Sequence, residues 1–267
     1  MEQVLVEAKI EVSKPNLGRI RAYNVVMGFL HLVQGLLIIW LSNGFSLPIR
    51  TSYLVFNPLT QTLDSSMKHL FDVRFGYWVA AFSFLSALAH FIVSTVYYKK
   101  YAEGLSRHIN IARWIEYAFS ASLMMFLIGV LSGIYDLSTL VLMFGLTAVM
   151  NLCGLVMELV NQNKGNKSWS AFWVGSLAGI LPWIVIAIYF IGAVTSSDGG
   201  RPPSFVYWIY FSIFLFFNSF AINMYLQYKE VGPWKNYLFG EKVYILLSLI
   251  AKSALAWQIF AGTLRPQ

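Results

Sequence analysis

Charge is scarce in this sequence. Only 12% of the 267 residues are Asp, Glu, Lys or Arg, whereas 58% are hydrophobic, and the mean hydropathy is +0.62. A soluble globular domain carries about 25% charged residues. So few charges cannot cover a water-exposed surface, and their scarcity excludes an ordinary soluble domain. We expect most of the chain to face membrane lipid.

Other features are missing as well. Cys153 is the single cysteine, so no disulfide can form within the chain. The sequence has no Gly-rich phosphate loop, no HExxH motif and no Cys-His cluster, and we therefore do not expect an enzyme. The net charge of +7 does not indicate nucleic-acid binding, because Lys and Arg in loops fix the orientation of membrane proteins. The first apolar segment is too long for a signal peptide and lacks a small-residue cleavage site, so we expect no processed leader.

Long apolar runs take the place of charge. A helix needs roughly 20 mainly apolar residues to cross a hydrocarbon core of about 30 Å. Seven segments meet this standard, and we predict an all-α, seven-helix membrane bundle that forms one domain over residues 1–267. The predicted helices are residues 22–42, 75–97, 107–133, 138–160, 171–193, 204–226 and 243–264.

The connections between these segments suggest an orientation. Only the first is long, and its stretch Leu47 to Leu63 alternates Thr, Tyr, Val and Phe with polar residues, which predicts a small hairpin. Most Lys and Arg side chains fall in the connections that share a side with the N-terminus. The positive-inside rule then predicts a cell-membrane protein with its N-terminus in the cytoplasm and its C-terminus outside.

Two charged residues lie deep inside predicted spans. Lys252 and Glu116 are each about nine residues from the start of their helix, or about 14 Å deep, close to the midplane. An ionisable group at that depth costs several kcal/mol and indicates a functional site. The pair has three plausible uses: a structural ion pair, a relay or binding site in a transporter, or a Schiff base between the lysine and an aldehyde.

Nearby residues bear on these alternatives. Ser248 lies one turn before Lys252 and can hydrogen-bond its nitrogen. Aromatic residues cluster in the fifth and sixth predicted helices, as a slot for a long apolar ligand requires. His31 and His90, near Gln34 and Ser86, suggest a polar pocket that accepts or stores a proton. Arg113 and Glu158 lie closer to the cytoplasmic ends, and we expect them to be interfacial anchors.

Several segments resemble one known family. The run Leu247 to Phe260, which contains Ile-Ala-Lys-Ser-Ala-Leu-Ala-Trp, is similar to the retinal-binding helix of heliorhodopsins. Further similar segments are Asn110-Ile-Ala-Arg-Trp-Ile-Glu-Tyr117, Leu85 to Val93, Leu215 to Phe220 and Gly179-Ile-Leu-Pro-Trp183. The resemblance covers all seven helices in order, and the inverted orientation is also typical of that family.

The resemblance implies a set of functional residues. It implies all-trans retinal bound to Lys252 as a protonated Schiff base, with Glu116 as counterion and Ser248 as a hydrogen-bonding neighbour. It also implies that His31 and His90 border the proton-accepting region, with Gln34, Ser86, Asn110 and Tyr117 near it. Residues expected to line the polyene and ring are Met150, Trp173, Trp183, Phe217 and Asn218.

The function expected from this set is light sensing. Light isomerises the chromophore, a proton moves within the bundle, and a long-lived state is sensed by an unidentified partner without net ion pumping. The long first loop resembles a hairpin through which such proteins form homodimers. Two alternatives stay open: light-driven or light-gated ion transport on the same scaffold, and a retinal-free transporter or structural protein. Against ion transport, no span carries a clear ladder of carboxylates from Lys252 to either surface.

Overall fold

The fold is a bundle of membrane-spanning helices. The computed structural model describes residues 14–162, 165–196 and 201–265, and within these ranges seven helices are long and apolar enough to span a membrane. They are α1 (Lys14–Leu41), α2 (Phe75–Ser94), α4 (Ile111–Leu131), α5 (Leu137–Val160), α6 (Ser170–Thr195), α7 (Ser204–Tyr228) and α8 (Tyr237–Ile259). The predicted seven-helix fold is thus confirmed. The polar N-terminal segment lies largely outside the described residues.

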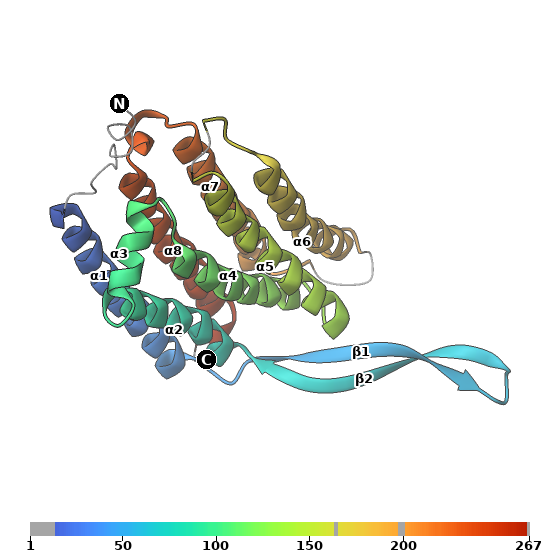
Figure 1. Ribbon diagram of the computed structural model, residues 1–267. Coiled ribbons are helices and arrows are strands. Elements are labelled where there is room, and N and C mark those ends of the chain that lie inside the picture. The colour runs from blue at the N-terminus through green and yellow to red at the C-terminus, as the bar shows by residue number, and fades with distance from the viewer. Residues whose placement is uncertain (1–13, 163–164, 197–200, 266–267) are drawn as a thin grey trace, which may run out of the picture.

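Helix α4 is the centre of the bundle (Figure 1). In its most apolar window 72% of the residues are buried, compared with 17–44% in the other six helices. The outer helices instead expose large apolar side chains such as Val33, Leu142 and Ile188. Apolar runs of this length must form helices in lipid, because only internal hydrogen bonds satisfy their backbone groups there.

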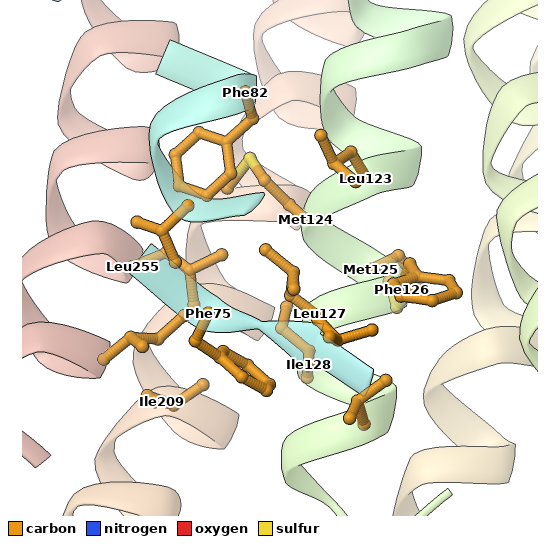
Figure 2. Close-up of a cluster of buried hydrophobic side chains, with 14 of the residues drawn as sticks. Phe75, Phe82, Leu123, Met124, Met125, Phe126, Leu127, Ile128, Ile209 and Leu255 are labelled. Atoms are coloured by element: carbon orange, nitrogen blue, oxygen red, sulfur yellow. The ribbon is translucent and has the colours of Figure 1, made fainter. Parts of the chain in front are cut away.

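One large apolar core packs around α4. Phe75 and Phe82 of α2, Leu127 of α4, and Ile209 and Leu255 from α7 and α8 meet in it (Figure 2). These side chains are almost completely buried. The tight packing of this cluster holds α2, α4 and α8 at fixed spacing, and these three helices carry the polar site described below.

A long hairpin connects α1 to α2. Strands β1 (Ser46–Asn57) and β2 (Thr62–Arg74) pair antiparallel and extend away from the bundle (Figure 1). The hairpin is longer than the predicted Leu47 to Leu63, because β2 is mostly polar and shows no clear alternation. Backbone pairing with β1 nevertheless satisfies its hydrogen bonds. The base of the hairpin is held by the buried side chains of Ile49 and Val73. The backbone nitrogen of Arg50 also donates a 2.8 Å hydrogen bond to the backbone oxygen of Tyr135.

Helix ends differ most from the predicted bounds in three places. The first helix begins at Lys14 rather than near residue 22. Residues expected as a loop form the short helix α3 (Tyr98–Ser106), and α4 starts only at Ile111, after a turn that includes His108 at positive φ. The last span begins at Tyr237, capped by Asn236 after the 3-10 turn η1 (Gly232–Lys235), and ends in the π-helical turn η2 (Phe260–Leu264). This earlier start places Glu241 inside the helix.

Candidate functional site

Lys252 lies in the middle of α8 and is 3% exposed. Its Nζ donates hydrogen bonds to Oε1 of Glu116 over 2.9 Å and to Oγ of Ser248 over 2.7 Å. A charged amine in the bundle interior is tolerated only with such partners. The structure therefore brings together an amine, a carboxylate and a hydroxyl that the sequence placed on two separate helices.

Glu116 receives a second hydrogen bond, from another helix. The hydroxyl of Ser86 on α2 donates to its Oε1 over 2.6 Å. Two donors on one carboxylate oxygen favour the ionised form of the acid. Helices α2, α4 and α8 thus meet at this single oxygen atom, and the negative charge is held facing Lys252.

The two intramembrane histidines lie next to each other. The rings of His31 on α1 and His90 on α2 stack with centroids 5.6 Å apart. His31 is fully buried, and neither of its ring nitrogens has a hydrogen-bond partner among the described residues. His90 instead pairs with Asn24, from Nδ1 to Oδ1 over 2.7 Å.

Gln34 connects three helices near the amine through its side-chain amide. Its Nε2 donates to Ser83 on α2 over 3.1 Å, and its Oε1 accepts from Ser253 on α8 over 2.5 Å. Since Ser253 follows Lys252 directly, this pair of bonds fixes the rotation of α8 and hence the direction of the amine.

A small polar cavity adjoins Glu116. Asn24, Ser86, His90, Asn110, Arg113, Tyr117 and Ser248 line it together with Glu116. Tyr117 also closes the wall of the apolar pocket, since its hydroxyl donates to the Tyr244 carbonyl oxygen over 2.9 Å. Its ring centroid is 5.2 Å from the Lys252 nitrogen. The phenol therefore separates a polar compartment from an apolar one.

The apolar pocket begins at Lys252 and continues between α5, α6 and α7. One part is lined by Lys252, Met124, Met150, Phe217 and Phe220, and the adjoining part shares Met150, Phe217 and Phe220 and adds Trp183 and Asn218. Of the five residues expected to line a polyene and ring, four are here. Trp173 is not, because it is 66% exposed and points away from the lining. Its neighbour Phe172, rotated by one helical position, lines the pocket instead.

Glycines make room along the pocket wall. Gly154 on α5 and Gly175 and Gly179 on α6 line it, and a Cβ at any of them would come closer than 3.0 Å to a neighbouring side chain. Such a slot, apolar and ending at a buried amine, fits a long apolar aldehyde such as retinal. Lys252 would hold the aldehyde carbon, and the aromatic walls would hold the chain.

A second buried charge cluster corrects the prediction for Arg113 and Glu158. Both were expected to be interfacial anchors, but Arg113 is 7% and Glu158 3% exposed, and the two form an ion pair. Arg113 also pairs with Glu241, which is 0% exposed. Arg113 and Glu158 are therefore ion-pair partners inside the bundle rather than exposed anchors, and the early start of α8 packs Glu241 against the same guanidinium.

Asn110 links this cluster to the start of α4. Its side-chain oxygen accepts from the Arg113 backbone nitrogen and caps the helix, while its Nδ2 donates to Glu241 over 2.7 Å. Its backbone nitrogen donates to Glu158 over 2.8 Å. Asn110 thus caps helix α4, a role that was not predicted when it was placed near the proton-accepting region.

Three buried residues near the site were not predicted from the sequence. Glu241 was assigned to a loop, although the capping residue Asn236 five positions earlier was a usable signal for the helix start. Asn24 and Tyr101 line the polar cavity. Asn24 was a polar residue within an apolar predicted span, and this was a usable signal. Tyr101 gave no signal in the sequence, because its position depends on the packing of α3.

Fold and site together define a class: a multi-pass membrane protein of seven helices with a buried lysine paired to a carboxylate. The heliorhodopsin family model matches residues 20–264 of the chain. The chain therefore belongs to the heliorhodopsin family, as the resemblance of its helices predicted. No curated protein matches the chain. Membership in this family implies a retinal chromophore and a rhodopsin-like photoreceptor rather than a classic enzyme.

Proposed function

We propose that this protein is a light sensor that carries all-trans retinal on Lys252 as a protonated Schiff base. The observation that carries the proposal is the position of the Lys252 amine. It is buried in the middle of α8 between Glu116 and Ser248 and faces an apolar, aromatic pocket. The proposal assigns Glu116 as counterion, since its carboxylate is the partner of the nitrogen in the ion pair.

The protein's own residues then have distinct tasks. When bound, retinal supplies a light-driven isomerisation of its polyene next to the Lys252 nitrogen. Ser248 orients that nitrogen, and Ser86 holds Glu116 as an anion. His31 and His90 are the proposed proton acceptors, because they are neighbouring bases on the same polar side of the bundle. Met150, Trp183, Phe217 and Asn218 are proposed to confine the chromophore.

The supporting residues keep this arrangement dry and rigid. Gln34 fixes the rotation of α8, Asn110 caps α4, and Tyr117 closes the apolar pocket toward the polar cavity. We propose that a proton delivered to the histidines stays in the bundle, and that its slow return produces a long-lived signalling state. Loss of the positive charge beside Glu116 would bias the packed helices around it.

Light-driven or light-gated ion transport is the second candidate. The observation in its favour is the cluster of Glu158 and Glu241, two buried carboxylates of which the sequence analysis placed the first at the interface and the second in a loop. Photocurrents under voltage clamp distinguish the two functions. A sustained current that depends on light would overturn the sensory proposal, whereas no current beyond a transient is expected.

A spectrum tests the retinal site directly. Purified protein given all-trans retinal should absorb visible light, and mass spectrometry should find the adduct on the peptide that contains Lys252. Lys252→Ala should abolish the band. Lys242→Ala, an exposed lysine on the same helix, is the matched control and should leave it unchanged. A colourless wild type, or an adduct on another side chain, would refute the proposal.

Orientation and assembly are part of the same proposal. The excess of Lys and Arg on the N-terminal side supports an N-terminus in the cytoplasm. The hairpin exposes apolar side chains such as Tyr53, Leu54 and Phe56, which supports a homodimer formed through it. Accessibility of single introduced cysteines to a membrane-impermeant reagent, and the mass of the protein in detergent, test the two points separately.

A further inference from the structure

Asn24 is a buried amide that joins three elements. It lies on α1, is 2% exposed, and its Nδ2 donates to the Ile20 carbonyl oxygen over 3.0 Å and to the Tyr101 hydroxyl over 3.2 Å. Because a carbonyl oxygen only accepts, the first of these bonds fixes which end of the amide is the nitrogen. The Asn24 oxygen must therefore face His90.

This orientation determines the tautomer of His90. The Asn24 oxygen cannot donate, so Nδ1 of His90 carries a hydrogen and donates over 2.7 Å. The Nε2 nitrogen of the neutral ring is then the one free to take up a proton. Asn24 thus positions the ring and directs its basic nitrogen.

Tyr101 carries the connection to the cytoplasmic helix α3. It is 4% exposed and packs with Leu105, Ile20, Val93 and Leu238 in a small apolar cluster. Burial raises the pKa of its phenol, so the hydroxyl stays protonated and can act as a hydrogen-bond partner. The rest of α3, including Lys99 and Lys100, is mostly exposed. Tyr101 and Leu105 are therefore the main anchors of this helix.

Two cavities meet at Tyr101. It lines the polar cavity beside Glu116 and also a larger cavity between α3 and the start of α4, whose other walls include Lys100, Glu103 and Arg107. Asn110 lines both as well. A shift of Tyr101 would thus change the boundary between the buried site and the cytoplasmic end of the bundle.

We propose that Asn24 and Tyr101 form a polar link that positions His90 and transmits its protonation to helix α3. The inference rests on the proposed function and adds the route by which the buried site reaches the cytoplasmic surface. Charged and titratable groups facing His90 are His31 from α1, Glu116 and Arg113 from α4, and Lys252 from α8.

The physical basis is charge-assisted hydrogen bonding. When His90 becomes cationic, its bond to the Asn24 oxygen shortens and strengthens, because a charged donor binds roughly twice as strongly as a neutral one. Polarisation of the amide also strengthens its bond to the Tyr101 hydroxyl. Both changes alter the hydrogen bonding of Tyr101, which anchors α3. The chemistry at Lys252 does not require Tyr101.

The experiment places a spin label on α3. Lys99→Cys is labelled in a Cys153→Ala background, which removes the single native cysteine, and the retinal-loaded protein is compared before and after illumination. Tyr101→Phe removes only the hydroxyl of the link. Tyr97→Phe, the same change on a tyrosine at the start of the same helix, is the matched control. Asn24→Leu is a second variant that breaks the link at His90.

The expected results distinguish a role of the Asn24–Tyr101 link from an effect on retinal binding. Light should change the mobility of the label in wild type and in Tyr97→Phe, and Tyr101→Phe should reduce that change by about threefold or more while the visible band and its light-induced shift remain. Asn24→Leu should also alter the rate of proton uptake, by about threefold to tenfold. An undiminished label response in Tyr101→Phe, or no response in a wild type with a normal photocycle, would overturn the link but not the retinal site. A colourless wild type would overturn both.

Discussion

The fit of Trp114 against Gly154 allows a quantitative prediction. Trp114 is 5% exposed, and its indole packs against α5 at Gly154, where a Cβ would come closer than 3.0 Å to three ring carbons. Ordinary carbon contacts are about 3.5–4.0 Å, so the ring must move by roughly 1 Å in Gly154→Ala. The indole cannot move freely, because the Arg113 guanidinium lies 4.5 Å from its centre.

Gly145→Ala is the matched control. Gly145 is in the same helix and faces outward, and a Cβ at this position would meet no neighbouring atom within 4 Å. Both substitutions gain the same helix preference, about 1 kcal/mol, so this contribution cancels in the comparison. The remaining difference is the cost of overpacking, about 1–3 kcal/mol. We expect Gly154→Ala to unfold about 2–10 °C below Gly145→Ala.

The assay is thermal unfolding of both variants in the same detergent, followed by tryptophan fluorescence and by loss of the visible band. Displacement of Trp114 should also narrow the apolar pocket, so Gly154→Ala should bind retinal more slowly. Equal unfolding temperatures for the two variants would contradict close packing of the Trp114 indole against Gly154.

Three further predictions follow. Glu116→Gln should shift the absorption to longer wavelength, because the ground-state cation loses its partner, and an unchanged spectrum would mean that the counterion lies elsewhere. Arg113→Gln should cost about 3–5 kcal/mol in thermal unfolding, because Glu241 stays buried without a cation, and adding Glu241→Gln should recover part of the loss. A hydrogen bond and the charge of Lys167 lower the pKa of Glu230, so their small stabilisation is present at neutral pH and is lost as the pH falls through that lowered pKa. Lys167→Met should bring the NMR titration of Glu230 back toward the ordinary range, and an unchanged titration would contradict the pairing.

The spans and the central pair were predictable because both depend on distance along a helix. Apolar runs of about 20 residues define the spans, and the helical rise alone puts Lys252 and Glu116 at similar depth. Contacts that depend on how a helix is rotated about its axis were harder to predict from the sequence. Trp173 and Phe172 are equally apolar neighbours, and only the packing of α6 decides which one faces the pocket.

Helix starts were the other source of error. Charged residues at the end of an apolar run look like loop residues, so the last span was predicted from residue 243 and Glu241 was left outside it. In the bundle Arg113 balances that acid, and a buried charge with its partner is compatible with a span. The pairing joins α4 and α8, which are more than a hundred residues apart in sequence, and no local pattern reveals it.

The position of Arg113 bears on where a proton can go. Arg113 and Glu116 line the same polar cavity, and Arg113 lies between it and the buried carboxylates Glu158 and Glu241. A guanidinium does not give up its proton in a protein, so it cannot pass one on. On the proposed function, His31 and His90 can take up a proton that leaves the Lys252 nitrogen, whereas Arg113 cannot relay it toward the carboxylates, and this difference favours storage within the bundle over release across the membrane.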